Sequence, residues 1–219
     1  FQWVNTYGAD FETFGNGVAV DNAGYIYTTG WLNDTVDFDP GAAVQNLMSD
    51  GSADMYLQKL DPSGNLVWAQ SYGDTGTDRG MSVSVDNAGN VYVIGDFSGT
   101  VDFDAGPGVS NQIAAGVSTD IYVLKCDLNG AYLWAGKMGA FNAVDNGLAM
   151  SNDDFGNIYT TGFFNQTADL DPTSGSDQFT AVDFGSAVFV QKLSQCVNTA
   201  TMDDVVACNS YTWIDGNTY

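Results

Sequence analysis

The sequence contains no histidine, and its 219 residues include a single arginine, Arg79. Without histidine the chain cannot build a Ser-His-Asp or Cys-His catalytic group or a His-ligated zinc site. A single arginine leaves few means of clamping a phosphate or of stabilising a charged transition state. These absences predict a protein that is not an enzyme and that has no cofactor built on histidine.

Long apolar segments are also missing. No run approaches the roughly 20 residues of a membrane span. Phe1 does not open a basic stretch followed by an apolar one, as a signal peptide would. We therefore expect no membrane insertion, and a chain that is either cytosolic or numbered from a processed start.

Cysteine is scarce, with three residues. Cys126 lies in the apolar segment IYVLKCD and is expected to be a small core residue, because free cysteine is commonly buried. Cys196 and Cys208 could form a disulfide in an oxidising compartment, but the sequence leaves their pairing open.

Acidic residues dominate the charge: Asp and Glu number 27 against 5 Lys and Arg, a formal net charge of -22 at pH 7. Nearly all of these acids are aspartates, which favour turns and cation-binding loops. Such a chain repels nucleic acid and anionic membrane surfaces, and it attracts hard cations, above all calcium. Solubility by itself explains part of the charge.

One sequence motif occurs three times. Residues 20–30 read VDNAGYIYTTG, residues 85–95 read VDNAGNVYVIG and residues 152–162 read NDDFGNIYTTG. The closing glycines are 65 and 67 residues apart. A repeat on this scale predicts stacked or radially arranged units. The landmarks that keep the period are Gly30, Gly95 and Gly162; Gly15, Gly80 and Gly147; Lys59, Lys125 and Lys192; and Trp3, Trp68 and Trp134.

Each unit has the pattern of β-structure. Segments such as GVAVD and YIYTTGW are rich in β-branched and aromatic residues. Between them, the segment from Asp21 to Gly24 has type I turn chemistry, with a left-handed glycine. The sequence therefore predicts an all-β, β-propeller-like repeat of about 65 residues. Its three units, at about 1–66, 67–132 and 133–195, would form an open or partial propeller, since closed propellers have about 4–8 blades.

The three repeated tryptophans are expected in the core between neighbouring sheets, with carbohydrate stacking as the alternative. The order of motifs within a unit is W-a-x-x-x-G, G-x-x-V-D-x-x-G-N-x-Y-x-x-G, V-D-F-D-P-G and D-x-Y-x-x-K-L-D-x-x-G. This order resembles the SBBP-type β-propeller repeat of secreted bacterial proteins, over roughly residues 1–195. The resemblance implies a secreted or cell-surface location, as in surface proteins of gliding bacteria that use type IX secretion.

Residues 196–219 do not fit the repeat. They carry a hairpin signal at Asp215 and Gly216 and resemble the opening of the C-x-S-Y-T-W-x-D-G modules that follow propellers in such surface proteins. We expect the start of a separate, truncated β module and a chain that is a fragment of a longer protein.

Each unit also carries an Asp-x-Asp pair, in TVDFDPG, TVDFDAG and TADLDPT. Residues two apart on a strand share a face, so the two carboxylates repel each other unless something lies between them. Calcium is one candidate, held by carboxylate, carbonyl and water oxygens. The candidate metal ligands are Asp37, Asp39, Asp102, Asp104, Asp169 and Asp171.

The alternative is an ion pair between these acids and the repeated lysine. Lys59 lies in MYLQKL, which is apolar on both faces, so its ammonium needs an acid partner. The third unit departs from the other two, with Ala187 where they have Asp54 and Asp120. The sequence leaves calcium, the lysine pair and a plain solvated turn open.

The pattern favours a non-enzymatic extracellular module for adhesion, display or ligand binding, with an unknown carbohydrate or protein ligand. Paired carboxylates can hydrolyse glycosides, but three copies in a repeat argue for a structural role. One alternative is an accessory substrate-binding domain of a larger secreted enzyme. Another is a structural subunit of a surface filament that self-associates through open sheet edges.

Overall fold

A computed structural model describes residues 2–8, 12–182 and 185–194. In these ranges the regular structure consists of β-strands without helices, which confirms the predicted all-β fold. The first sheet has the order β1 (Thr13–Val20), β2 (Ile26–Leu32), β5 (Asp54–Leu60) and β6 (Leu66–Tyr72). The second has the order β7 (Arg79–Val85), β8 (Val91–Phe97), β11 (Asp120–Cys126) and β12 (Tyr132–Met138). The third has the order β13 (Asn146–Asn152), β14 (Ile158–Asn165) and β17 (Ser186–Leu193).

A small two-stranded hairpin is inserted into each sheet between its second and third strands. The hairpins are β3 (Thr35–Asp37) with β4 (Asn46–Met48), β9 (Thr100–Asp102) with β10 (Asn111–Ile113), and β15 (Thr167–Asp169) with β16 (Gln178–Thr180). All pairings, in sheets and hairpins alike, are antiparallel.

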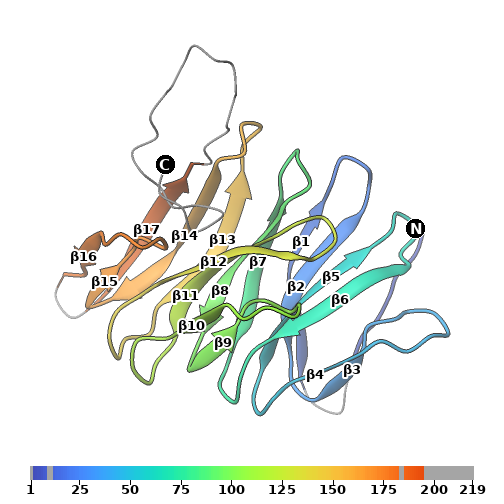
Figure 1. The fold of residues 1–219 in the computed structure, drawn as a ribbon, viewed down its shortest axis with the longest axis horizontal. Coiled ribbons are helices and arrows are strands. Elements are labelled where there is room, and N and C mark those ends of the chain that lie inside the picture. The colour runs from blue at the N-terminus through green and yellow to red at the C-terminus, as the bar shows by residue number, and fades with distance from the viewer. Residues whose placement is uncertain (1, 9–11, 183–184, 195–219) are drawn as a thin grey trace.

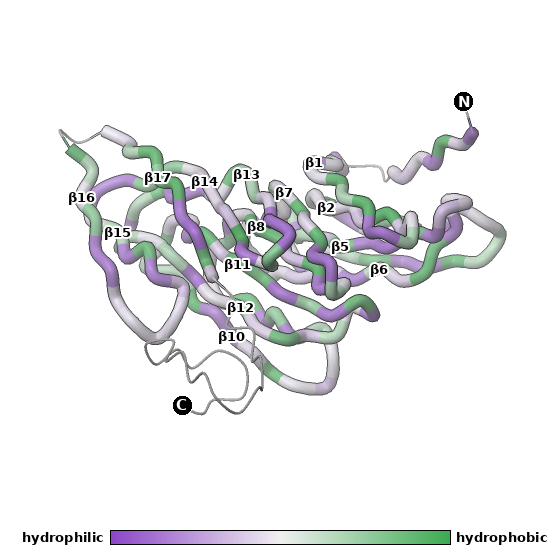
Figure 2. Tube along the Cα trace, turned by 90° about the horizontal axis from the view of Figure 1, so that it is seen from above, coloured by the Kyte–Doolittle hydropathy of each residue, from purple (hydrophilic) through white to green (hydrophobic). Residues whose placement is uncertain are grey.

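The three sheets follow one another along the long axis of the molecule, like neighbouring blades of a fan (Figure 1). Strand β7 contacts both β1 and β13, so these three edge strands form the side on which the sheets converge. Viewed from above, the sheets form an open arc, with the first and third sheets at opposite ends (Figure 2). The predicted open or partial propeller is confirmed.

The repeated motif (residues 20–30, 85–95 and 152–162) contains the turn between the first two strands of each sheet. Asp21 accepts hydrogen bonds at Oδ1 from the backbone N–H groups of Ala23 and Tyr25, both at 2.9 Å. Gly24 has a φ of +85°, as the left-handed position requires. The same turn recurs at the other two copies, so the predicted turn chemistry is correct.

The glycine that closes each motif is required by a close approach of two backbones. Gly30 lies opposite Gly15, where β1 has a bulge between Gly15 and Gly17. A Cβ on Gly30 would lie 1.8 Å from the carbonyl oxygen of Phe14, and Gly95 and Gly162 face the same obstacle. A side chain at these positions would collide with the neighbouring strand, which gives a physical reason for the repeat.

Two apolar cores join the sheets. At the first junction, between the first and second sheets, Met55 and Leu57 pack in one cluster with Val83 and Tyr122. At the second junction, between the second and third sheets, Ile121 and Val123 take the places of Met55 and Leu57. Cys126 is buried in the first of these cores, as predicted. Cys196, Cys208 and the predicted module at 196–219 lie outside the described residues.

The sheets are offset from the sequence units. The expected unit boundaries near residues 66 and 132 fall at the first residues of β6 and β12, the outer strands of the first and second sheets. A sequence unit therefore begins with the last strand of one sheet and continues with the inner strands of the next.

Candidate functional site

The three Asp-x-Asp pairs lie where β3, β9 and β15 end and a loop begins. Asp37 is the last residue of β3, and its Oδ1 accepts the backbone N–H groups of Asp39 at 2.9 Å and Gln45 at 2.8 Å. The expectation that Asp37 and Asp39 share a strand face is therefore wrong, because Asp39 follows the strand and its own N–H turns back to Asp37. These two hydrogen bonds hold the pKa of Asp37 below its usual value.

The second acid of each pair caps the next turn of the same loop. Asp39 Oδ1 accepts the N–H of Gly41 at 2.6 Å, and Asp104 Oδ1 accepts that of Gly106 at 2.8 Å. Asp102 and Asp169 each accept two backbone N–H groups of their loop, as Asp37 does. Asp171 accepts the N–H of Thr173, as Asp39 accepts that of Gly41. The structure thus brings the acids of each pair together as caps of a turn.

For the first unit, the position of Lys59 contradicts the lysine alternative. Its Nζ donates to the carbonyl oxygen of Leu128 at 2.8 Å and lies 4.5 Å from the ring centroid of Tyr25. Burial lowers the pKa of Lys59, and the acids that oppose this effect are Asp21 and Asp127. Lys59 therefore lies beside the hairpin turns, away from Asp37 and Asp39.

Within the described ranges, no three His, Cys, Asp or Glu side chains converge closely enough to hold a metal ion. A calcium ion at an Asp pair would need backbone carbonyls and water to complete its 6–8 oxygen ligands. The chemistry of the donors is compatible with this, and calcium stays a prediction.

Two of the repeated tryptophans, Trp3 and Trp68, lie over hairpin turns. Trp68 Nε1 donates to the carbonyl oxygen of Leu128, in the β11–β12 turn, at 3.3 Å. Trp68 and Trp134 are half-buried and pack against the two inter-sheet cores, as predicted. Trp3 is 37% exposed, because the described part of the chain has no sheet preceding the first.

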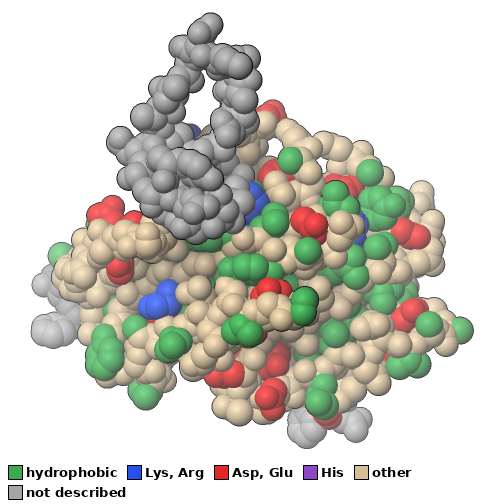
Figure 3. Space-filling view, in the orientation of Figure 1, with side chains coloured by type: hydrophobic (Ala, Val, Ile, Leu, Met, Phe, Trp, Pro, Cys, Tyr) green, Lys and Arg blue, Asp and Glu red, His purple; other side chains and the backbone are tan. Residues whose placement is uncertain are grey.

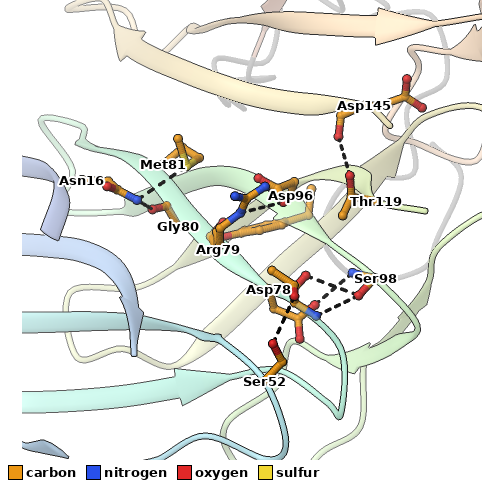
Figure 4. Close-up of polar contacts among 12 residues, drawn as sticks. Asn16, Ser52, Asp78, Arg79, Gly80, Met81, Asp96, Ser98, Thr119 and Asp145 are labelled. Atoms are coloured by element: carbon orange, nitrogen blue, oxygen red, sulfur yellow. Dashed lines mark hydrogen bonds and ion pairs between the residues drawn. The ribbon is translucent and has the colours of Figure 1, made fainter. Parts of the chain in front are cut away.

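In the part of the chain that the structure describes, buried aspartates at the sheet junctions include Asp54, Asp78, Asp120 and Asp145, and the sequence pattern did not single out Asp78 and Asp145. Asp78 accepts hydrogen bonds from the N–H groups of Asp74 and Ser98, both at 3.0 Å. Figure 4 shows Asp78 beside Ser98. Asp145 repeats this arrangement one sheet later. The signal that could have found them is their spacing, since each comes two residues before a repeated glycine.

The other two acids, Asp54 and Asp120, open β5 and β11. The Oδ2 of Asp54 accepts the N–H of Asp50 at 3.0 Å, and that of Asp120 accepts the N–H of Ala115 at 2.8 Å. The buried Oδ1 of each has no hydrogen-bond partner among the described residues. Burial raises the pKa of Asp54 to about 6 and that of Asp78 to about 7.

The single arginine neutralises another buried acid. Arg79, on β7, donates from Nη2 at 2.8 Å and from Nε at 3.1 Å to one oxygen of Asp96, on the adjacent strand β8 (Figure 4). Asp96 has no exposed surface. Two N–H groups of the guanidinium are thus used in a charge-assisted pair with a buried carboxylate.

A cleft of about 300 Å³ lies between the outer strand of the second sheet and the β15–β16 loop of the third. It combines one aromatic side chain with several hydrogen-bonding groups. Its lining includes Gln112, Trp134, Lys137, Thr173 and Ser174. Aromatic faces and polar groups arranged around one opening are typical of sites for polar organic ligands.

The outer surface carries scattered acids and few basic side chains, seen as red and blue patches on one face in Figure 3. Among the described residues, no helix has the length and apolar character to cross a bilayer.

Comparison with known proteins supports the repeat type. Residues 2–33 match the SBBP family, described as a beta-propeller repeat. The chain is 26% identical over 159 residues to an uncharacterized WD repeat-containing protein of Acanthamoeba polyphaga mimivirus, covering 66% of this chain and 11% of that protein. It is 30% identical over 168 residues to the regulatory protein FlaEY of Caulobacter vibrioides, covering 71% of this chain and 17% of that protein.

The chain thus spans less than a fifth of the length of these relatives. The matched segment 2–33 runs from the N-terminal segment through β1 and β2. The comparisons and the sheet arrangement together show a β-propeller-type repeat protein, of a kind suited to interaction with other molecules.

Proposed function

We propose that this chain is a non-enzymatic, extracellular β-propeller module of a surface protein, used for adhesion, display or ligand binding. The observation that carries this proposal is the Trp134 cleft, the region lined by Gln112, Trp134, Lys137, Thr173 and Ser174. It is an opening on the surface in which an aromatic ring lies among polar groups, and we propose a carbohydrate as its ligand.

The acids of the described chain support a non-catalytic role. The loop acids cap turns, Asp96 is paired with Arg79, and the junction acids are buried between sheets. A glycosidase needs two carboxyls that face a substrate across an open cleft. Among the described residues that line the Trp134 cleft there is no Asp or Glu, which supports a binding site over a hydrolytic one.

Binding to a carbohydrate array tests this proposal, followed by titration calorimetry with any sugar retained. The Trp134→Ala variant removes the stacking surface and should weaken binding at least tenfold, which is about 1.4 kcal/mol. Trp68→Ala is the matched control, because Trp68 occupies the same strand position in the first sheet outside the cleft. Equal loss in both variants would show a stability effect, and the absence of any bound sugar would refute the carbohydrate proposal.

The same cleft would serve an accessory substrate-binding domain of a larger secreted enzyme. A catalytic domain elsewhere in the full-length protein would favour that alternative. The proposal also includes calcium at the Asp pairs, which rests on the acidity of the chain. It includes a secreted location and export by type IX secretion, which rest on the resemblance of the repeat.

A further inference from the structure

Among the described residues the third sheet has three strands, whereas the other two sheets have four. In the first sheet β5 pairs with β6, and in the second β11 pairs with β12. Strand β17 holds the corresponding place in the third sheet, and its outer side pairs with no strand among the described residues. The described part of the chain leaves the backbone N–H and C=O groups on that side without a strand partner, so they could pair with another strand.

The opposite end of the arc has a segment that resembles an outer strand without a sheet. Residues 2–8 contain Trp3 and Tyr7, which precede Trp68 and Tyr72 of β6 by 65 residues. This period is that of the repeat itself. Residues 2–8 therefore correspond in sequence to a β6 strand of a sheet that would precede the first sheet.

The contacts of residues 2–8 repeat those of β6. Trp68 Nε1 donates to the Leu128 carbonyl of the following sheet at 3.3 Å, and Trp3 Nε1 donates to the Pro62 carbonyl, also at 3.3 Å. Pro62 occupies the same position in the β5–β6 turn as Leu128 does in the β11–β12 turn.

The tyrosines Tyr7 and Tyr72 also make matching contacts. Tyr72 stacks on Phe103 of the second sheet's hairpin loop, with centroids 6.3 Å apart. Tyr7 stacks on Phe38 of the first sheet's hairpin loop at 5.4 Å. The segment is thus already seated on the first sheet as β6 is seated on the second.

The sheet faces at the two ends are also complementary. Met55 and Leu57 of β5 are buried at the first junction, whereas Val188 and Val190, in the same positions on β17, are 77% and 79% exposed. At the other end Val18 is 68% exposed, whereas its counterpart Val83 is buried at the first junction. Each end thus presents one half of the apolar contact that the internal junctions complete.

One polar contact is likewise half formed. At the first junction Lys59 and Trp68 both donate to the Leu128 carbonyl. Trp3 already donates to the corresponding Pro62 carbonyl. Lys192, the counterpart of Lys59, lies on the exposed face of β17, so its ammonium could donate to the Pro62 carbonyl of a sheet packed against that face.

We propose that the outer edge of β17 accepts residues 2–8 of a second copy of this chain, so that copies associate head to tail. The register of β5 with β6 predicts that Trp3 of one copy pairs with Lys192 of the other and that Tyr7 pairs with Val188. The two ends of one copy cannot meet, because they lie at opposite ends of the arc in both views (Figures 1 and 2). The contact continues the two internal junctions and is heterologous, so it can extend beyond a dimer.

This inference is independent of the Trp134 cleft and of any carbohydrate ligand. Sedimentation velocity of the full chain over a range of concentrations tests it. The salt concentration should be physiological or higher, because the net charge of -22 opposes association and a Debye length of about 8 Å screens it. The expected result is a weight-average mass that rises with concentration beyond that of a dimer.

Two variants each block one end. Val190→Lys and Val18→Lys place a charge in the apolar contact, and each should weaken self-association at least tenfold. Val117→Lys, on a fully exposed loop residue of the second sheet, is the matched control and should associate like the parent chain. Thermal melts establish that all three variants are folded.

Mixing the two blocked variants distinguishes a head-to-tail contact from any symmetric one. The mixture retains one intact pair of ends, Val190 of the Val18→Lys variant and Val18 of the Val190→Lys variant, so dimers should return and longer species should not. Amide hydrogen exchange of β17 should slow on association, since its edge becomes paired. A parent chain that stays monomeric, blocked variants that still associate, or β17 amides that stay unprotected would each overturn the proposal.

Discussion

The two sheet junctions share one architecture and differ in charge. Both bury two aspartates, Asp54 with Asp78 at the first junction and Asp120 with Asp145 at the second. At the second, Lys137 Nζ lies 3.3 Å from Asp120 Oδ2. At the first, the strand position of Lys137 is held by Ser71.

The linkers between the sheets add to the difference. Asp74 in the first linker stands where the second has Ala140, and its charge raises the pKa values of Asp54 and Asp78 further, after burial, the larger cause. The first junction therefore depends on protonation to relieve buried charge, whereas the second has an ammonium for this purpose. The comparison teaches that backbone N–H groups hold these acids in place at both junctions, that burial raises their pKa values, and that Lys137 opposes this effect for Asp120.

Glycine-to-alanine changes at the linkers should break both junctions alike. A Cβ on Gly73 would lie 2.3 Å from Asp54 Cγ, and one on Gly139 would lie 2.6 Å from Asp120 Oδ1. Each change forces a buried carboxylate out of place and should cost about 3 kcal/mol of unfolding free energy in urea titrations. Gly8→Ala is the control, because its Cβ would meet nothing within 4 Å. A large loss in one linker variant alone would mean that the two junctions are packed differently.

The pH dependence of stability should separate the junctions. The raised pKa of Asp54, about 6, means that the folded state holds this proton more strongly than the unfolded state does. Its contribution is full below the unfolded pKa, near 4, and is lost as the pH rises through about 6. We expect the contribution of Asp54 to the unfolding free energy to fall by about 2 kcal/mol between pH 4 and pH 8. Below pH 4, acids with lowered pKa values such as Asp37 act in the opposite direction.

The Asp54→Asn variant removes the titrating group and can keep the hydrogen bond from Asp50. Its stability should vary less with pH, and at pH 8 it should exceed that of the parent chain because a buried charge is gone. Asp177→Asn, at an exposed side chain, changes the net charge equally and serves as control. The same pH profile in both variants would show that general charge repulsion, and not the first junction, governs the titration.

The sequence predicted the repeat, the hairpin turns and the open arc, because period, turn residues and β-propensity act locally. It could not place Asp37 at the end of a strand, since the length of β3 depends on its pairing with β4. It left a pair between Lys59 and the loop acids open, and it could not exclude this pair because the lysine reaches across a junction to Leu128, 69 residues away. Asp78 and Asp145 were overlooked because their burial depends on a neighbouring sheet.

Removing the Lys137 ammonium should make the second junction resemble the first, with a buried carboxylate that has no cation from the described residues beside it. Lys137→Met leaves Asp120 buried without its ion-pair partner and should destabilise the chain at pH 8 by about 1 kcal/mol, since the lysine side chain is 37% exposed and solvent screens the pair. At pH 5 the loss should shrink as Asp120, whose pKa burial already raises, takes up a proton more readily. Ser71→Met is the matched control at the first junction. Equal losses at the two pH values would mean that Lys137 stabilises by packing alone.

A similarly small effect is expected from calcium. In the hairpin loops the Oδ1 atoms of Asp37 and Asp39 already accept backbone N–H groups, so an ion would have to bind mainly through the remaining oxygens. Calcium at a few times its dissociation constant should then raise the unfolding free energy by about 1 kcal/mol. Thermal melts in calcium and in EDTA measure this effect. The double change Asp37→Asn and Asp39→Asn should reduce it, whereas Asp54→Asn should not. If the Asp54 variant loses the response to calcium and the loop variant keeps it, the ion binds at the first junction. Its positive charge would then offset the buried carboxylates there, as Lys137 offsets Asp120 at the second junction.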